Sequence, residues 1–156
     1  MKKKKTIGIV AHDHRKKDMI EWAAFNWKEL VQHNLVCTGT TGKLVEETLH
    51  EKCEEHGAVP PTVTRLKSGP LGGDQQLGAM ICEGKVDLLI FFWDPMQPQP
   101  HDVDVKALLR ITVMYNIPTA SNRSTADFMV SSPLFHEEYE PKMKDYGAYI
   151  AREVDL

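Results

Sequence analysis

The sequence of 156 residues predicts an α/β fold, a single three-layer domain in which helices cover both faces of a five-stranded, mostly parallel, doubly wound sheet. Two observations favour this class. Short apolar runs alternate five times with segments of helical spacing, and the clearest run, residues 86–93, is apolar on both faces, as in a central parallel strand. The length suits one domain with a substantial core, and we find no internal repeat, linker or domain boundary.

The strands are expected at apolar runs bounded by polar, glycine or proline residues. In chain order these runs are residues 6–11, 35–38, 62–67, 86–93 and 117–120. The third run is the weakest of the five and the fourth is the clearest.

The helices are expected where apolar residues recur at intervals of three or four. In chain order these segments are residues 16–32, 44–53, 75–83, 103–115, 125–130 and 145–153. Gly57 and Gly84 end the second and third helices. Pro133 and Pro141 interrupt the chain before the last one. The core-facing residues of the fourth helix are expected to be Val105, Leu108, Leu109 and Thr112.

The composition is that of an ordinary globular protein, with 42% hydrophobic and 26% charged residues. The net charge of -3 argues against a general nucleic-acid binder. We interpret residues 1–5, with four lysines, as a solvated and mobile tail, because the apolar run that follows is too short for a membrane span or a signal peptide. Cys37, Cys53 and Cys82 are interpreted as buried, reduced thiols of a cytoplasmic protein.

A polar or glycine-rich cluster follows every predicted strand. These clusters are residues 12–14, 38–42, 68–70, 94–95 with 100–102, and 121–122. In parallel open sheets, ligands bind beyond the carboxyl ends of the strands. The sequence therefore predicts one site at this edge of the sheet.

Asp74 follows a loop rich in glycine and proline, residues 68–73, at the expected start of a helix. Glycine lets a ligand approach the main chain closely, so an acid after such a loop suits proton transfer. The alternative is that Asp74 only caps the helix, since aspartate is a favoured N-cap.

Residues 38–42 (TGTTG) are typical of an anion-binding turn before a helix. Lys43 is followed by Leu44 rather than by serine or threonine, which favours a monophosphate over a nucleoside triphosphate. Lys16, at the start of the first helix, is a second candidate contact for phosphate. A threonine-rich cap and a solvated lysine are the alternatives.

His101 follows Pro98 and Pro100, and these prolines stiffen its loop. A neutral imidazole there can donate a hydrogen bond to an oxygen that gains negative charge. The alternative is a loop histidine without a partner. His12 and His14, with His101 as third ligand, also allow a catalytic zinc site, although nothing else indicates that geometry.

The clusters at this edge of the sheet contain a carboxylate, two histidines, a lysine and an anion-binding turn. This set suits the abstraction of a proton beside a carbonyl group in a small phosphorylated substrate. Asp94 is expected to hold its loop through backbone N–H groups, and Asp102 or Asp104 to cap the fourth helix.

Seven motifs follow one another in the order of a known family: residues 9–13 (IVAHD), 38–42 (TGTTG), 68–76 (SGPLGGDQQ), 91–95 (FFWDP), 100–102 (PHD), 104–110 (DVKALLR) and 125–127 (TAD). In these motifs the sequence resembles the methylglyoxal synthase family, over residues 6 to 132. The resemblance implies a Rossmann- or flavodoxin-like architecture and a lyase that converts dihydroxyacetone phosphate into methylglyoxal and inorganic phosphate. It also implies no metal or organic cofactor, a cytoplasmic homohexamer, and inhibition by phosphate.

The resemblance places catalytic roles on Asp74, as the base, and His101, as the support of the enediolate oxygen. The positions expected to bind substrate are His12, Lys16, Thr38, Gly39, Thr40, Thr41, Ser68 and Gly69. Supporting roles are assigned to Asp13, Asp94 and Asp104.

The sequence departs from the family pattern in two places. Residues 46–64 form a longer segment, expected to extend the second helix and its loop. The arginine that relatives often place at a subunit boundary corresponds to Arg152, shifted by one residue with Glu153 in its place. Two other functions stay open: an effector-binding module like the regulatory domain of large carbamoyl phosphate synthetases, and a metal-dependent hydrolase built on His12, His14 and His101.

Overall fold

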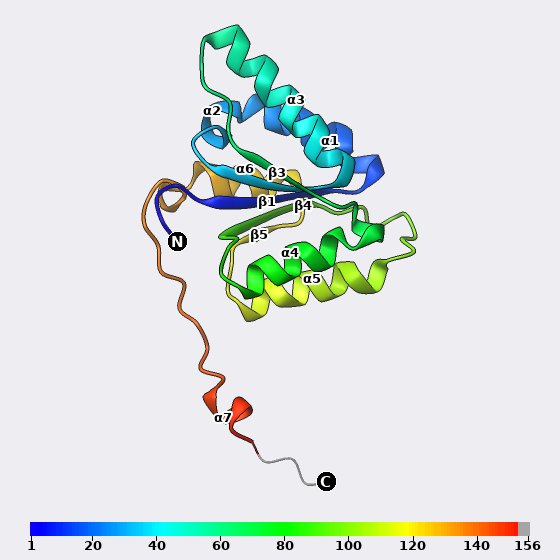
Figure 1. Ribbon diagram of the computed structural model, residues 1–156, viewed down its shortest axis with the longest axis vertical. Helices are drawn as coiled ribbons and strands as arrows, with labels where there is room; N and C mark the ends of the chain where they lie inside the picture. Colours follow the sequence, from blue (N-terminus) through cyan, green and yellow to red (C-terminus); the bar gives the residue numbers. More distant parts are fainter. Residues whose placement is uncertain (153–156) are drawn as a thin grey trace.

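The computed structural model describes residues 1–152. Five strands form one sheet in the order β3–β2–β1–β4–β5, and every neighbouring pair is parallel (Figure 1). The strands are β1 (Thr6–Ala11), β2 (Asn34–Thr38), β3 (Val63–Leu66), β4 (Leu88–Phe92) and β5 (Thr119–Ala120). The predicted α/β class and the five-stranded sheet are confirmed, and the sheet is fully parallel.

Helices cover both faces of the sheet (Figure 1). They are α1 (Lys16–Phe25), α2 (Trp27–Leu30), α3 (Gly39–His56), α4 (Gly73–Cys82), α5 (Asp102–Met114), α6 (Arg123–Ser131) and α7 (Gly147–Ile150). Three short 3₁₀ turns join them: η1 (Asp13–Arg15), η2 (Gly69–Leu71) and η3 (Pro133–Phe135). Helices α1, α3 and α6 pack on one face, and α4 and α5 pack on the other.

The core has two halves because successive side chains of a strand point to opposite faces. In β4, Leu88, Ile90 and Phe92 pack beneath α1, α3 and α6, whereas Leu89 and Phe91 pack beneath α4 and α5. This is why β4, residues 88–92, has no polar face.

The strand order reverses between β1 and β4. The chain runs outward from β1 to β2 and β3, and then crosses to β4 and β5 on the other side. The loops after β1 and β4 therefore leave toward opposite faces, which opens a crevice at the carboxyl ends of these strands. The predicted site residues come from the loops around this crevice.

The helix expected over residues 16–32 is divided in two. The Asn26 side chain donates a hydrogen bond to the carbonyl oxygen of Trp22 at 3.0 Å, and α2 begins directly after Asn26. A short polar side chain that bonds its own backbone competes with the helical ladder, which explains the interruption. The last helix covers only Gly147–Ile150, and Glu153 lies outside the described residues.

Two predictions about burial are wrong. Lys5 is only 1% exposed, and its ammonium donates hydrogen bonds to the carbonyl oxygens of Lys2 and Glu137 at 2.8 and 2.6 Å. Its burial depends on the segment after η3, far away in the sequence, while Lys2 is exposed as expected. Cys82 is exposed at the end of α4, whereas Cys37 and Cys53 are buried.

Within residues 1–152 we find no helix with the length and apolarity that a membrane crossing needs.

Candidate active site

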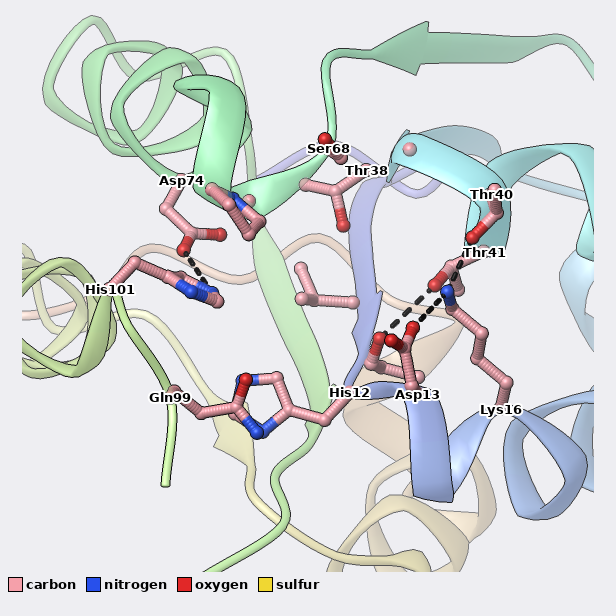
Figure 2. Close-up of a pocket in the computed structure, with 15 residues that line it drawn as sticks. His12, Asp13, Lys16, Thr38, Thr40, Thr41, Ser68, Asp74, Gln99 and His101 are labelled. Carbon is pink, nitrogen blue, oxygen red and sulfur yellow. Dashed lines mark hydrogen bonds and ion pairs between the residues drawn. The ribbon is translucent and has the colours of Figure 1, made fainter. Parts of the chain in front are cut away.

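A small pocket of about 90 Å³ lies at the carboxyl edge of the sheet (Figure 2). Drug-sized ligands need about 300 Å³ or more, so the pocket suits a small molecule. Its walls come from the loops after β1, β2, β3 and β4. The lining residues are Val10, Ala11, His12, Asp13, Lys16, Thr38, Gly39, Thr40, Thr41, Ser68, Gly69, Pro70, Asp74, Gln99 and His101. The structure thus brings together all ten residues to which the sequence assigned catalytic or substrate-binding roles.

Asp74 is a buried carboxylate in the first turn of α4. Gly72 is the N-cap of this helix, with φ of 96°, and no side chain caps it, so Asp74 does not serve as the cap. The Asp74 side chain is 2% exposed, and its Oδ2 has no hydrogen-bond partner among the described residues. Burial raises the pKa of this carboxyl; His101 opposes the rise and Asp104 adds to it.

His101 lies beside Asp74 on the same side of the pocket (Figure 2). Its Nε2 lies 3.6 Å from Asp74 Oδ2, and its Nδ1 is buried without a partner within the described part of the chain. His101 precedes α5 directly, so the start of one helix on this face of the sheet presents the imidazole and the start of the other presents the carboxylate.

Gly69 keeps a space open beside these two groups. A Cβ on Gly69 would lie 3.0 Å from both Asp74 Oδ2 and His101 Nε2, and 3.2 Å from Asp74 Oδ1. Because Oδ2 and Nε2 are themselves only 3.6 Å apart, such a Cβ would stand in front of both atoms and not between them. A side chain at residue 69 would therefore fill the place from which a small ligand can contact both the carboxylate and the imidazole.

His12 is held in one neutral form by the backbone. Its Nδ1 accepts a hydrogen bond from the N–H of Asp94 at 3.1 Å, so in the neutral ring the proton sits on Nε2. This Nε2 is buried and has no partner within residues 1–152. Burial, followed by the proximity of His101, lowers the pKa of His12. The ring therefore offers an uncharged N–H donor to the pocket.

The turn at the start of α3 lies very close to the loop after β3. Gly39 has φ of 47°, and a Cβ there would lie 2.8 Å from the Cα of Ser68, so only glycine fits. Thr38 is the N-cap but makes no capping bond with its side chain. The N–H groups of the first helical turn lack intrahelical partners and carry partial positive charge. Thr41 Oγ1 is engaged, because it donates to the carbonyl oxygen of Ala11 at 3.3 Å.

Lys16 reaches from α1 to this turn. Its ammonium donates to Thr40 Oγ1 and to Asp13 Oδ1, the latter at 2.5 Å (Figure 2). Asp13 is an exposed carboxylate, and its hydrogen bond with Lys16 lowers its pKa. The cation is therefore in place at the anion-binding turn before any ligand arrives.

The remaining supporting residues lie outside the pocket. Asp94 Oδ1 accepts a hydrogen bond from the N–H of Met96 at 3.0 Å, which holds the loop after β4 as predicted. Asp104, in the first turn of α5, reaches the site only through its charge on Asp74. His14 is exposed, and residues 1–152 contain no group of three histidine, cysteine or acidic side chains placed to hold a metal ion.

Gln99 is a pocket residue that the sequence analysis missed. It lies between Pro98 and Pro100 in the loop after β4, the same loop that led us to His101. The sequence signal that could have indicated Gln99 was its position in a loop at the carboxyl edge of the sheet. Val10 and Ala11, at the end of β1, and Pro70, in η2, also line the pocket.

The arrangement has two chemically distinct ends. One end has helix N–H groups and an ammonium, which suit a phosphate dianion. The other end has a buried carboxylate whose pKa is raised and two imidazoles with ring nitrogens that lack partners. These are the parts needed to take a proton from a carbon beside a carbonyl group.

Comparisons with known proteins agree with this geometry. A family model described as the MGS-like domain matches residues 18–121. The chain is 59% identical to a methylglyoxal synthase of Maridesulfovibrio salexigens, over 99% of this chain and 100% of that protein. It is 52% identical to a methylglyoxal synthase of Proteus mirabilis, over 94% and 90% of the two chains. A crystal structure of methylglyoxal synthase from Elizabethkingia anophelis matches with a TM-score of 0.86 and 48% identity, covering 99% of this chain and 95% of that one.

Proposed function

This chain belongs to the methylglyoxal synthase family, and we propose that it is a lyase that converts dihydroxyacetone phosphate into methylglyoxal and inorganic phosphate. One observation carries the proposal. Within residues 1–152, Oδ2 of the buried Asp74 carboxylate has no hydrogen-bond partner, and it lies beside the His101 imidazole, next to a space that Gly69 keeps open and near the anion-binding start of α3.

The phosphate group binds at the start of α3. N–H groups that follow Gly39 in the first helical turn and the Lys16 ammonium contact its oxygens, and Ser68 lies next to this turn. The small volume then places the three-carbon chain toward Asp74 and the two imidazoles.

Asp74 is the base. It removes a proton from the hydroxymethyl carbon, and the electron pair of that C–H bond forms the enediolate. Because burial raises its pKa, Asp74 is a stronger base than an exposed carboxylate.

The imidazoles stabilise the enediolate. His12 donates from Nε2 to the carbonyl oxygen as this oxygen gains charge, and its neutral form follows from the backbone bond to Nδ1. His101, beside Asp74, supports the oxygen on the neighbouring carbon.

Phosphate then leaves. The hydroxyl group on the former hydroxymethyl carbon gives up its proton, and the electron pair of that O–H bond forms the aldehyde C=O bond. The enediolate double bond shifts to the carbon that carries the phosphate. The carbon–oxygen bond to phosphate breaks, and the phosphate leaves with that electron pair and accepts the hydroxyl proton. Elimination requires that the carbon–oxygen bond stand out of the enediolate plane, which the fixed position of the phosphate enforces. The enolate that remains gains a proton at its methylene carbon and becomes methylglyoxal.

One assay tests the function. Metal-free protein is incubated with dihydroxyacetone phosphate, and methylglyoxal and free phosphate are followed together. We expect equal amounts of both products, with no effect of a chelator. Binding without turnover would favour the effector-binding module, and activity that a chelator abolishes would favour a metal-dependent hydrolase.

We further propose a homohexamer in the cytoplasm that inorganic phosphate inhibits. Light scattering with size exclusion tests the assembly, and turnover at increasing phosphate tests inhibition. The Arg152 guanidinium donates to the carbonyl oxygen of Tyr149 at 2.8 Å and stacks on the Tyr149 ring at 3.5 Å. These contacts keep Arg152 with α7, and its part in sensing phosphate is tested by the inhibition curve of Arg152→Ala.

A further inference from the structure

The peptide group of Lys67 joins the two ends of the pocket. Its carbonyl oxygen accepts a hydrogen bond at 3.1 Å from the N–H of Gly39, the first residue of α3. A Cβ on Gly73 would lie 2.0 Å from the same oxygen, so the residue before Asp74 packs directly against it. One carbonyl group thus contacts both the start of the anion-binding helix and the start of the helix that carries the base.

Gln76 holds the backbone of Lys67 through the preceding peptide group, the one that carries the Lys67 N–H. Its Oε1, in the first turns of α4, accepts a hydrogen bond at 2.9 Å from the N–H of Lys67. Because β3 is an edge strand, its outer side has no neighbouring strand to hold the chain beyond its end. The chain continues from Lys67 directly into Ser68 and Gly69, which line the pocket.

We propose that Gln76 is a positioning residue that sets the separation between the phosphate-binding turn and the Asp74 carboxylate. Gln76 does not line the pocket and acts only through the Lys67 peptide group. The proposal rests on the proposed function, since elimination needs the phosphate and the base at a fixed spacing. Displacements of about 1 Å at such a spacing cost on the order of 10²-fold in rate.

The test compares two neighbouring glutamines. Gln76→Met keeps the length of the side chain but removes the acceptor, Gln76→Ala removes both, and Gln76→Glu keeps an acceptor. Gln75→Met is the matched control, because Gln75 is also exposed on the same helical turn and its side chain makes no hydrogen bond among residues 1–152. Turnover kinetics, phosphate affinity by calorimetry, thermal unfolding and exchange of the Lys67 amide by NMR are measured for each variant.

We expect faster exchange of the Lys67 amide in Gln76→Met and Gln76→Ala. In the same variants kcat/KM falls about tenfold or more and phosphate binds about three- to tenfold more weakly. Gln76→Glu and Gln75→Met stay within about twofold of the parent protein. If Gln76→Ala fails to fold, Gln76→Met carries the test.

Two results would overturn the proposal. One is a Gln76→Met variant with the parent kcat/KM and phosphate affinity. The other is a Gln76→Glu variant as impaired as Gln76→Met, because a retained acceptor should restore the spacing. If the parent protein forms no methylglyoxal, the proposed function fails, and amide exchange with phosphate affinity still decides the role of Gln76.

Discussion

Replacement of Gly69 by alanine tests whether the space that Gly69 leaves open beside Asp74 and His101 is where the reacting carbon lies. The new Cβ would stand 3.0 Å from Asp74 Oδ2 and from His101 Nε2, below the 3.4 Å at which ordinary contact begins. Both side chains are buried, so relief of this contact moves them by a few tenths of an ångström, and the methyl group also occupies the space itself. We expect kcat/KM to fall by about 10²-fold or more.

The fold should tolerate this change, because the backbone of Gly69 does not have the positive φ that disfavours alanine. Loss of glycine flexibility in the unfolded chain favours the native state by about 0.4–1 kcal/mol, which offsets part of the contact strain. The matched control is Gly78→Ala on α4, where an added Cβ meets only Leu108 Cδ1 at 4.0 Å. It should raise the melting temperature and leave turnover unchanged.

Phosphate release from dihydroxyacetone phosphate and thermal unfolding are measured for both alanine variants. A Gly69→Ala protein that turns over within about threefold of the parent would refute the reasoning, because the reacting carbon would then lie elsewhere. Inactivity accompanied by a collapsed melting temperature would also refute it, since the loss would come from the fold.

Three further predictions follow from the buried titratable groups. Because the pKa of Asp74 is raised by burial, the folded protein binds more protons than the unfolded chain between the ordinary and the raised pKa, and the free energy of unfolding falls as pH rises through that window. Asp74→Asn should therefore melt at a higher temperature than the parent at pH 7 while kcat/KM drops by about 10²-fold or more; a lower melting temperature or near-normal turnover would contradict the assignment. His12→Ala should lower kcat by about 10²-fold and leave phosphate affinity unchanged in calorimetry, whereas equal losses of both would place His12 at the phosphate instead. A thiol reagent should modify Cys82 first in the native protein, because Cys82 is exposed whereas Cys37 and Cys53 are buried, and burial raises the pKa of Cys37 to about 12. Mass spectrometry of the labelled peptides shows whether this order holds.

The main contacts of the site depend on residues that lie far apart in the chain. The tautomer of His12 follows from a backbone N–H at Asp94, and the carbonyl oxygen of Lys67 accepts a hydrogen bond from Gly39 at the start of α3. The motif of residues 68–76 indicated a loop that lines the pocket, but its spacing did not show that Asp74 Oδ2 would be buried without a partner among residues 1–152.

Local periodicity was sufficient for the elements themselves. Each strand was predicted within a few residues. Four of them come from short apolar runs bounded by polar, glycine or proline residues, which favour buried strands. The sequence of β3 is partly polar, and its prediction was the weakest. The division of the first helix at Asn26 was missed because a single side-chain bond to the backbone overrides an otherwise regular apolar pattern.

The amino-acid sequence alone determined the alternation of strands and helices, and with it the edge of the sheet at which polar residues gather. Parallel connection puts every strand end on one side, so this outcome needs no knowledge of distant contacts. Tertiary structure alone decided which groups are buried and which hydrogen bonds they make, as Lys5, Gly69 and His12 show. Burial and pairing arise between segments remote in the chain, and they set the pKa values and the open space on which the chemistry depends.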